Sequence, residues 1–247
     1  GRILITLQRK DIGQLGGQDM LHGAMRKLSS SLSSKRGQSA EPGSVREVLC
    51  LAEEKLEGWC SREKAAALVD LIRQEKPDIC VEIGIFGGRS IVPCAAALRE
   101  NGSGVVYGIE TWSPAVATEH FTSEENDAWW KEVDFPGIKR NFLAFIAKHD
   151  LTRQIRVLEC PSREAYVLFD RIDFLHIDGA HSVFNAAEDV VLYAKKLKVG
   201  GIVVLDDIDW PTTGPAHDIL KSNADPVLTL TNKDGLPACA FMRKVRN

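Results

Sequence analysis

The sequence lacks the features that mark several large classes of protein. No apolar run approaches the roughly 20 residues that a helix needs to cross a bilayer. The formal net charge of -3 gives no electrostatic basis for binding nucleic acid or an anionic membrane surface. The six cysteines are scattered without a CxxC pair, so we expect free, mostly buried thiols. Free thiols are typical of a reducing compartment, and we expect a cytoplasmic protein.

What is present is the composition of a globular protein, with 44% hydrophobic and 26% charged residues among 247. Residues 29–44 are rich in Ser, Gly and Pro and carry hardly any large apolar side chain, which predicts a flexible linker. The residues before this linker are too few for a domain of their own. We therefore expect a flexible N-terminal arm over residues 1–43 and one domain over residues 44–247.

From residue 44 onward, helix-like and strand-like patterns alternate. Helices are expected at 45–59, at 61–75 with Ser61 as the N-cap, at 90–100 and at 183–197, and strands at 79–83, 104–109, 154–158, 172–177 and 202–205. Such alternation requires right-handed crossovers and a mainly parallel sheet. Two further strand-like runs, 227–231 and 238–243, flank an Asn-Lys-Asp-Gly turn, so the last strand should be antiparallel to its neighbour. The predicted fold is a Rossmann-like, doubly wound α/β fold with a mainly parallel seven-stranded sheet.

Two apolar runs of this sequence end abruptly in carboxylates. Asp178 follows Leu175-His176-Ile177, while Asp206 and Asp207 follow the run from residue 202 to 205. If both runs are parallel strands, the three aspartates meet at the carboxyl edge of one sheet, where open α/β sheets bind their ligands. Three carboxylates repel one another unless a cation or protons intervene, which favours a divalent metal with oxygen ligands. The alternative is that the aspartates cap helices or accept hydrogen bonds from loop amides.

Residues 81–90 (VEIGIFGGRS) leave a strand, turn through glycines and enter a helix, so backbone can approach a ligand there. The dinucleotide fingerprint GxGxxG is absent because Phe86 fills its second glycine position. Glu82, two residues before the first glycine, would repel a pyrophosphate but attract a cationic ligand. Glu110 ends the next strand, where an acid is the usual partner of two ribose hydroxyls. These features indicate an adenosine with a positive charge and no phosphates, which describes S-adenosylmethionine.

Four motifs, VEIGIFGGRS, GIE, HIDGAHS and GGIVVLDD, follow one another at suitable intervals within residues 60–245. With these motifs the chain resembles the class I S-adenosylmethionine-dependent methyltransferases. Within that class it resembles the metal-dependent O-methyltransferases of small hydroxylated molecules and of natural-product sugars. The resemblance implies a cofactor site formed by Glu82, Gly84, Gly87, Ser90, Glu110, Ser162 and Asp178. It also implies a metal site, with magnesium as the favoured ion, formed by Asp178, Asp206 and Asp207.

The same resemblance gives His181, three residues after Asp178, the place of the general base. Relatives that methylate catechols hold a lysine there and sugar-directed relatives a histidine, so this chain sides with the latter. In the expected reaction, the metal held by Asp178, Asp206 and Asp207 lowers the pKa of an acceptor hydroxyl, and His181 takes its proton. The alternative for His181 is to cap or pack against the following helix. His176 lies on a buried strand and is expected to be a core histidine.

Tryptophans are the remaining candidates for the acceptor site. Trp112, Trp129 and Trp130 lie in the long irregular segment 112–135, which is typical of a lid or a binding loop. Ordinary packing explains them equally well, and the same choice holds for Trp210.

The leading prediction is an enzyme, a magnesium-assisted, S-adenosylmethionine-dependent O-methyltransferase that acts on a hydroxyl of a small molecule or sugar. A methyltransferase that needs no metal is the nearest alternative, and a non-catalytic module that binds S-adenosylmethionine is another. A nicotinamide-dependent oxidoreductase is disfavoured by Glu82 and by the missing fingerprint. The expected partner is a small-molecule hydroxyl acceptor, without nucleic acid or membrane. The oligomeric state is left open, a homo-oligomer included.

Overall fold

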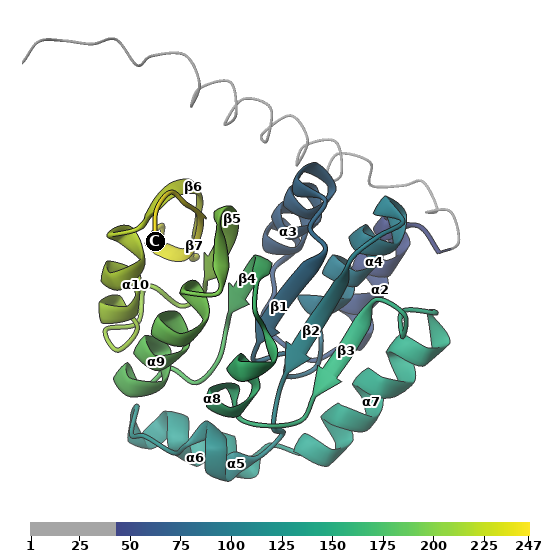
Figure 1. The fold of residues 1–247 in the computed structure, drawn as a ribbon. Helices are drawn as coiled ribbons and strands as arrows, with labels where there is room; N and C mark the ends of the chain where they lie inside the picture. Colours follow the sequence, from purple (N-terminus) through teal and green to yellow (C-terminus); the bar gives the residue numbers. More distant parts are fainter. Residues whose placement is uncertain (1–42) are drawn as a thin grey trace, which may run out of the picture.

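A seven-stranded sheet with the order β3-β2-β1-β4-β5-β7-β6 forms the centre of the computed structural model, which describes residues 43–247 (Figure 1). The arm expected over residues 1–43 lies outside the described residues except for Gly43. The strands are β1 (Ile79–Ile83), β2 (Val105–Ile109), β3 (Ile155–Leu158), β4 (Ile172–Ile177), β5 (Leu197–Leu205), β6 (Ala224–Thr231) and β7 (Pro237–Lys244). Strands β1 to β5 pair in parallel, and β7 is antiparallel to both β5 and β6. The predicted α/β fold with an antiparallel last strand is confirmed.

Helices cover both faces of the sheet. One face carries α2 (Val45–Lys55), α3 (Arg62–Glu75), α4 (Ile91–Asn101) and α7 (Phe135–Lys148), and the other α8 (Ser162–Ala165), α9 (Val183–Ala194) and α10 (Gly214–Lys221). The strands supply side chains to both layers, because Cys80 and Phe174 join one core cluster while Val81 and Leu175 join the other. Such burial on both faces explains why β1 and β4 read as continuous apolar runs rather than as alternating ones.

The boundary between α9 and β5 differs from the prediction. The helix ends at Ala194, and the strand begins at Leu197, with the two glycines inside it rather than before it. A Cβ atom at Gly201 would lie 2.9 Å from the carbonyl oxygen of Asp173, so glycine allows the close approach of β5 to β4. The prediction was wrong here because an apolar run at this point fits a helix end and a buried strand equally well.

The predicted start of α3 is confirmed. Ser61 is the N-cap, and its hydroxyl accepts a hydrogen bond of 3.1 Å from the backbone N–H of Lys64. Most of the following residues up to Ile72 are buried against the sheet and α4. The cap therefore places Lys64 in the first turn of a helix whose axis and rotation are set by core packing, and the residue is only 7% exposed.

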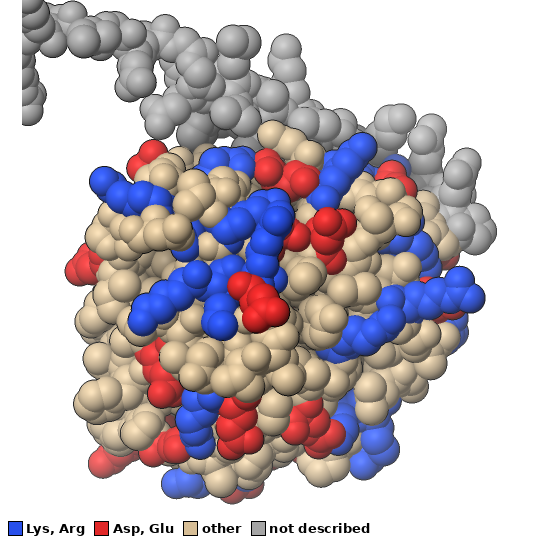
Figure 2. Space-filling model, in the orientation of Figure 1, with Lys and Arg blue, Asp and Glu red and all other residues tan. Residues whose placement is uncertain are grey.

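The segment predicted as irregular contains two short helices, α5 (Pro114–Ala117) and α6 (Glu124–Glu132), beyond the carboxyl ends of the strands. A single turn, η1 (Tyr166–Leu168), follows α8. All six cysteines are free and four of them are buried, as expected. Figure 2 shows Lys and Arg side chains interspersed with Asp and Glu on the face that it presents. Among the described residues, no helix has the length and apolar character needed to span a bilayer.

Candidate active site

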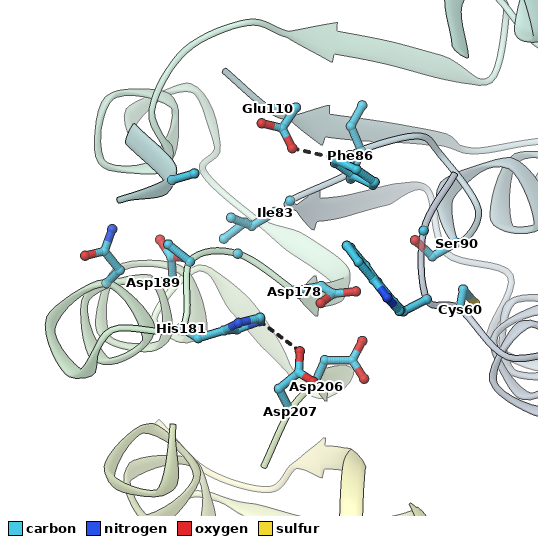
Figure 3. A pocket seen from close by; sticks show the side chains of 18 of the residues that line it. Cys60, Ile83, Phe86, Ser90, Glu110, Asp178, His181, Asp189, Asp206 and Asp207 are labelled. Carbon is cyan, nitrogen blue, oxygen red and sulfur yellow. Dashed lines mark hydrogen bonds and ion pairs between the residues drawn. The ribbon is translucent and has the colours of Figure 1, made fainter. Parts of the chain in front are cut away.

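A cavity of about 620 Å³ opens at the carboxyl edge of the sheet, around the ends of β1, β2, β4 and β5 (Figure 3). The predicted site residues that line it are Gly84, Ser90, Glu110, Ser162, Asp178, His181, Asp206 and Asp207. The strand order switches direction between β1 and β4. Strands β2 and β3 lie on one side of β1, and β4 and the later strands lie on its other side. Ligands of open α/β sheets bind at such a switch point.

The glycine-rich turn after β1 forms one wall of the cavity. Gly84 has φ of 81°, and a Cβ atom there would collide with the carbonyl oxygen of Asp178. Glycine is therefore required both by the backbone conformation and by the close approach of the two loops. Gly87, in contrast, does not line the cavity, and a Cβ atom on it would meet the carbonyl oxygen of Glu57. Packing against Glu57 therefore explains why residue 87 is a glycine.

Glu82 lies behind this wall and is not among the lining residues. Its side chain is 1% exposed, and its carboxylate accepts a hydrogen bond from the hydroxyl of Ser90. Nδ1 of His176 lies 3.3 Å from the other carboxylate oxygen of Glu82. Glu82 therefore does not reach the cavity; it orients Ser90, which does. His176 is also 1% exposed, which confirms the expectation of a core histidine.

Glu110, at the end of β2, is held by three backbone amides. It accepts hydrogen bonds from the N–H groups of Phe86 at 3.0 Å, Thr111 at 2.8 Å and Trp112 at 2.9 Å. Burial raises the pKa of this carboxyl group above its usual value, and the three amide bonds oppose that rise. The amides of Thr111 and Trp112 both bond to Oε1 and that of Phe86 bonds to Oε2, so Oε2 keeps one acceptor position for a neighbouring hydroxyl.

Asp189 is a lining residue that the sequence analysis missed. It lies on α9 and is 3% exposed. Burial raises the pKa of its carboxyl group to about 7, although a hydrogen bond with Ser162 opposes the rise. The signal was available, because Asp189 shares a helical face with buried Ala186, Val190 and Tyr193. An acid within an apolar stripe is either paired or placed for a ligand.

The three predicted metal ligands meet at one edge, and one side chain that the sequence analysis did not consider lies between two of them. The ammonium nitrogen of Lys64 is 3.1 Å from Oδ2 of Asp178 and also forms an ion pair with Oδ2 of Asp206. Nε2 of His176 lies 3.0 Å from that same oxygen of Asp206. Burial by itself would lower the pKa of Lys64, but Asp178 raises it well above its usual value, so the side chain carries its charge.

His181 and Asp207 form a second pair at this edge. Nε2 of His181 lies 2.8 Å from Oδ2 of Asp207 (Figure 3). The His181 ring centroid is 4.7 Å from that of Trp210. Burial lowers the pKa of His181, but its bond to Asp207 raises it above the usual value overall. The following helix is capped by Ser182 rather than by His181, which excludes the capping alternative. His181 also lines the cavity, beside Asp207 and Trp210.

The donor atoms do not fit a divalent ion bound as the sequence predicted. Among the described residues, two groups of side chains could hold a metal: His176 with Asp178 and Asp206, and His181 with Asp178 and Asp207. Neither group contains all three predicted ligands. The first coincides with the position of the Lys64 ammonium, and the second would take up the histidine that pairs with Asp207. Magnesium at Asp178, Asp206 and Asp207 stays a prediction that this geometry does not favour.

Aromatic side chains form the outer wall of the cavity. Trp59 stacks on Phe86 with ring centroids 5.3 Å apart, and the edge of Trp129 meets Trp130 at 4.8 Å. Two of the candidate lid tryptophans thus border the cavity. Trp112 does not, because it is 7% exposed and its indole N–H donates to the carbonyl of Phe86. We predicted that Trp59 lies in a helix. The helix ends at Lys55, and Trp59 forms part of the cavity wall.

Comparisons with known proteins identify the family and the fold of this chain. A family model described as a methyltransferase domain matches residues 81–208. No curated protein sequence matches the chain at a significant level. The structure resembles that of the O-methyltransferase TomG from Streptomyces achromogenes, which is involved in tomaymycin synthesis and was solved with S-adenosylmethionine (SAM). Their identity is 16% and the TM-score 0.60, over 94% of this chain and 100% of that one.

Two further solved structures are similar at the level of the fold. An O-methyltransferase from Bacillus cereus, in complex with S-adenosylhomocysteine (SAH), shares 14% identity with a TM-score of 0.59, over 89% of this chain and 99% of that one. The SAH-bound methyltransferase PaMTH1 from Podospora anserina shares 14% identity with a TM-score of 0.57, over 94% and 99%. Identities this low show a common fold and do not transfer a substrate.

Proposed function

This chain belongs to the methyltransferase-domain family, and we propose that it transfers a methyl group from SAM to a hydroxyl oxygen of a small molecule or sugar. The observation that carries the proposal is the continuity of one cavity from Glu110, which suits a ribose hydroxyl, to His181, which suits a proton acceptor. The similar structures bound to SAM or SAH support the choice of cofactor. The expected reaction is that of an enzyme, not of a binding module, because the cavity holds a candidate base beside the cofactor residues.

The cofactor would lie across the carboxyl ends of β1 and β2. Glu110 would accept a hydrogen bond from the ribose, the backbone of Gly84 would approach the methionine part, and Ser162 with Asp189 would border the adenine. Bound there, the cofactor supplies an electrophilic methyl group on a positively charged sulfur. Asp178, at the far side of the Gly84 turn, would face that charge.

His181 would act on the acceptor hydroxyl. With its Nε2–H donated to Asp207, the imidazole keeps Nδ1 as the nitrogen that can accept a proton. The hydroxyl proton would move to Nδ1 as the oxygen takes the methyl group, which SAM would supply while leaving as SAH with the electron pair of the broken bond. The Asp207 carboxylate then stabilises the imidazolium. Holding the two reactants in line supplies much of the remaining rate.

The metal and the surroundings of the reaction are the finer parts of the proposal. The sequence predicts magnesium, but Lys64 favours the metal-independent alternative, so we derive no step through a metal.

The indole faces of Trp59 and Trp129 suit a sugar or another flat acceptor. Free cysteines throughout the chain support the cytoplasm as its location. We propose a small-molecule acceptor and no nucleic-acid or membrane partner.

The first experiment is isothermal titration of the purified protein with SAM, with Glu110→Ala as the test variant. We expect saturable binding to the wild-type protein and at least tenfold weaker binding to the variant, because a ribose hydrogen bond to a charged acceptor is lost. Glu132→Ala, at an exposed acid of α6, is the matched control and should bind like wild type. Absence of SAM binding to the wild-type protein would refute the proposal. Formation of SAH with panels of sugar and phenolic acceptors then identifies the acceptor class.

A further inference from the structure

Lys64 is a buried lysine that is paired with two carboxylates. It is 7% exposed, and its ammonium forms ion pairs with Asp178 and Asp206, which are separated from it by more than one hundred residues in sequence. Lysine is almost never this buried unless it is paired. The two carboxylates are themselves little exposed, at 27% and 10% of their side chains. Without a cation between them they would repel each other in a medium that screens charge poorly.

The chain places this ammonium firmly. Ser61 caps the helix at the backbone N–H of Lys64, and the residues that follow are packed into the core. The side chain therefore starts from a fixed backbone and runs to the carboxyl edge of the sheet, where it lines the cavity. Lysine has three N–H donors, of which the two aspartates use two. The third is available to a ligand oxygen in the cavity.

We propose that the Lys64 ammonium takes the place of a divalent metal ion at this edge, so that the chain holds its own cation there and transfers methyl groups without a metal. The part concerning the reaction rests on the proposed function, whereas the part concerning metal binding does not. In the reaction, the free N–H of Lys64 donates to the acceptor oxygen and stabilises the negative charge that develops as His181 removes the proton.

The Lys64 ammonium and a divalent metal ion would compete for the same ligands, which supports the proposal. The ligand atoms of His176, Asp178 and Asp206 lie within 4.8 Å of one another, which is the spacing of a metal site, and Lys64 contacts two of the three residues. A divalent ion at the centre of this group would lie against the ammonium and repel it. Accommodating the ion would require Lys64 to leave both partners and stay buried as an unpaired charge.

The test is binding of Mn²⁺, followed by electron paramagnetic resonance of the free ion, to wild type, Lys64→Ala and Lys64→Met. We expect no stoichiometric site in wild type below millimolar Mn²⁺. In Lys64→Ala, the three vacated ligands should bind one Mn²⁺ at least tenfold more tightly than wild type does, and a further Asp206→Asn change should abolish that site. Lys131→Ala, at an exposed lysine of α6, is the control and should behave like wild type.

Either of two results would overturn the proposal. One is a stoichiometric Mn²⁺ site in wild type that Asp206→Asn or Asp207→Asn removes. The other is a folded Lys64 variant that gains no Mn²⁺ site. Circular dichroism checks folding, and Lys64→Met keeps the length of the side chain if alanine is not tolerated. Because the wild-type measurement needs neither activity nor cofactor, a failure of this proposal is distinguishable from a failure of the methyltransferase proposal, which the SAM titration tests separately. Unchanged wild-type turnover after chelation would support the reaction part.

Discussion

Nε2 of His181 lies 2.8 Å from Oδ2 of Asp207, across the gap between the loops that follow β4 and β5. This pair joins two neighbouring strands at the mouth of the cavity and sets which imidazole nitrogen is free. Asp207 has φ of 54°, in the left-handed region that costs energy for a residue with a side chain. Backbone strain of this kind occurs at functional sites, where the surrounding structure holds it in place.

Replacing His181 with alanine should lower turnover far more than acceptor affinity. Loss of a general base costs about 10²- to 10⁴-fold in rate, so we expect a fall of that order in kcat with a small change in KM. Asp207→Asn should show a smaller fall in kcat, because the imidazole remains but loses its orienting carboxylate. Initial-rate kinetics of SAH formation measures both. His217→Ala, on α10 and outside the cavity lining, is the control. Full activity in His181→Ala would remove it as the base.

Gly84→Ala should destabilise the protein and weaken SAM binding together. The added Cβ atom would collide with the carbonyl oxygen of Asp178, and the φ of 81° alone costs about 1–2 kcal/mol. Gly102→Ala separates the two effects, because Gly102 has a similar φ of 75° with nothing within 4 Å of the added atom. Thermal melts and SAM titration are the measurements. Equal losses in both variants would show that the close approach to Asp178 adds nothing.

The pH dependence of stability should carry a contribution from Asp189. Its pKa is raised to about 7 by burial, so the folded protein holds a proton that the unfolded chain releases near its ordinary value. The stability it contributes is complete below that ordinary value and is lost as pH rises through about 7. Asp189→Asn cannot ionise and should therefore not lose this stability at high pH. The loss in wild type amounts to about 1.4 kcal/mol of unfolding free energy for each unit by which the pKa is raised.

Urea unfolding of the protein without cofactor at pH 5 and pH 8 tests this expectation. Asp189→Asn should be more stable than wild type at pH 8, and the difference should shrink toward pH 5. Glu188→Gln changes the adjacent, exposed acid of α9 and should show no such trend. A stability difference that does not vary with pH would contradict the burial of an ionising carboxyl group at this position.

Asp173→Asn should be strongly destabilising. Its carboxylate, 4% exposed, accepts hydrogen bonds from the amides of Asp78 and Ile79 and pairs with Arg171 and Lys198, each at 2.9 Å. Burial opposes ionisation, but Lys198 and the other partners lower the pKa to about 2. Breaking a buried pair costs about 3–5 kcal/mol, and the solvent exposure of Arg171 and part of Lys198 reduces this, so we expect about 2–3 kcal/mol at pH 7.

The depressed pKa fixes the pH window of that loss. The stability from Asp173 is complete above its ordinary value and disappears as pH falls through about 2, so the variant should approach wild type in acid. Urea unfolding at pH 7 and pH 3 measures the difference, with Asp225→Asn, at an exposed residue of β6, as the control. A cost that is as large at pH 3 as at pH 7 would contradict this account.

Local rules in the sequence determined the elements and most of the cavity edge. Apolar runs that end in carboxylates predicted β4 and β5, and the serine before the first turn predicted the start of α3, because strand burial and helix capping depend on neighbouring residues. Parallel strands end at one edge, so Glu110, Asp178 and Asp206 could be placed around the same cavity before any contact was known.

Only the tertiary structure decided which side chains contact and neutralise those carboxylates. Lys64 reads as an ordinary polar residue in the first turn of a helix, and its contact with Asp206 spans 142 residues, beyond the reach of any local pattern. Glu82 and His176 likewise became partners through the pairing of β1 with β4. Charge pairing in a buried site depends on side chains from separate elements meeting in space. Sequence by itself determines that a charge is present, and packing determines what neutralises it.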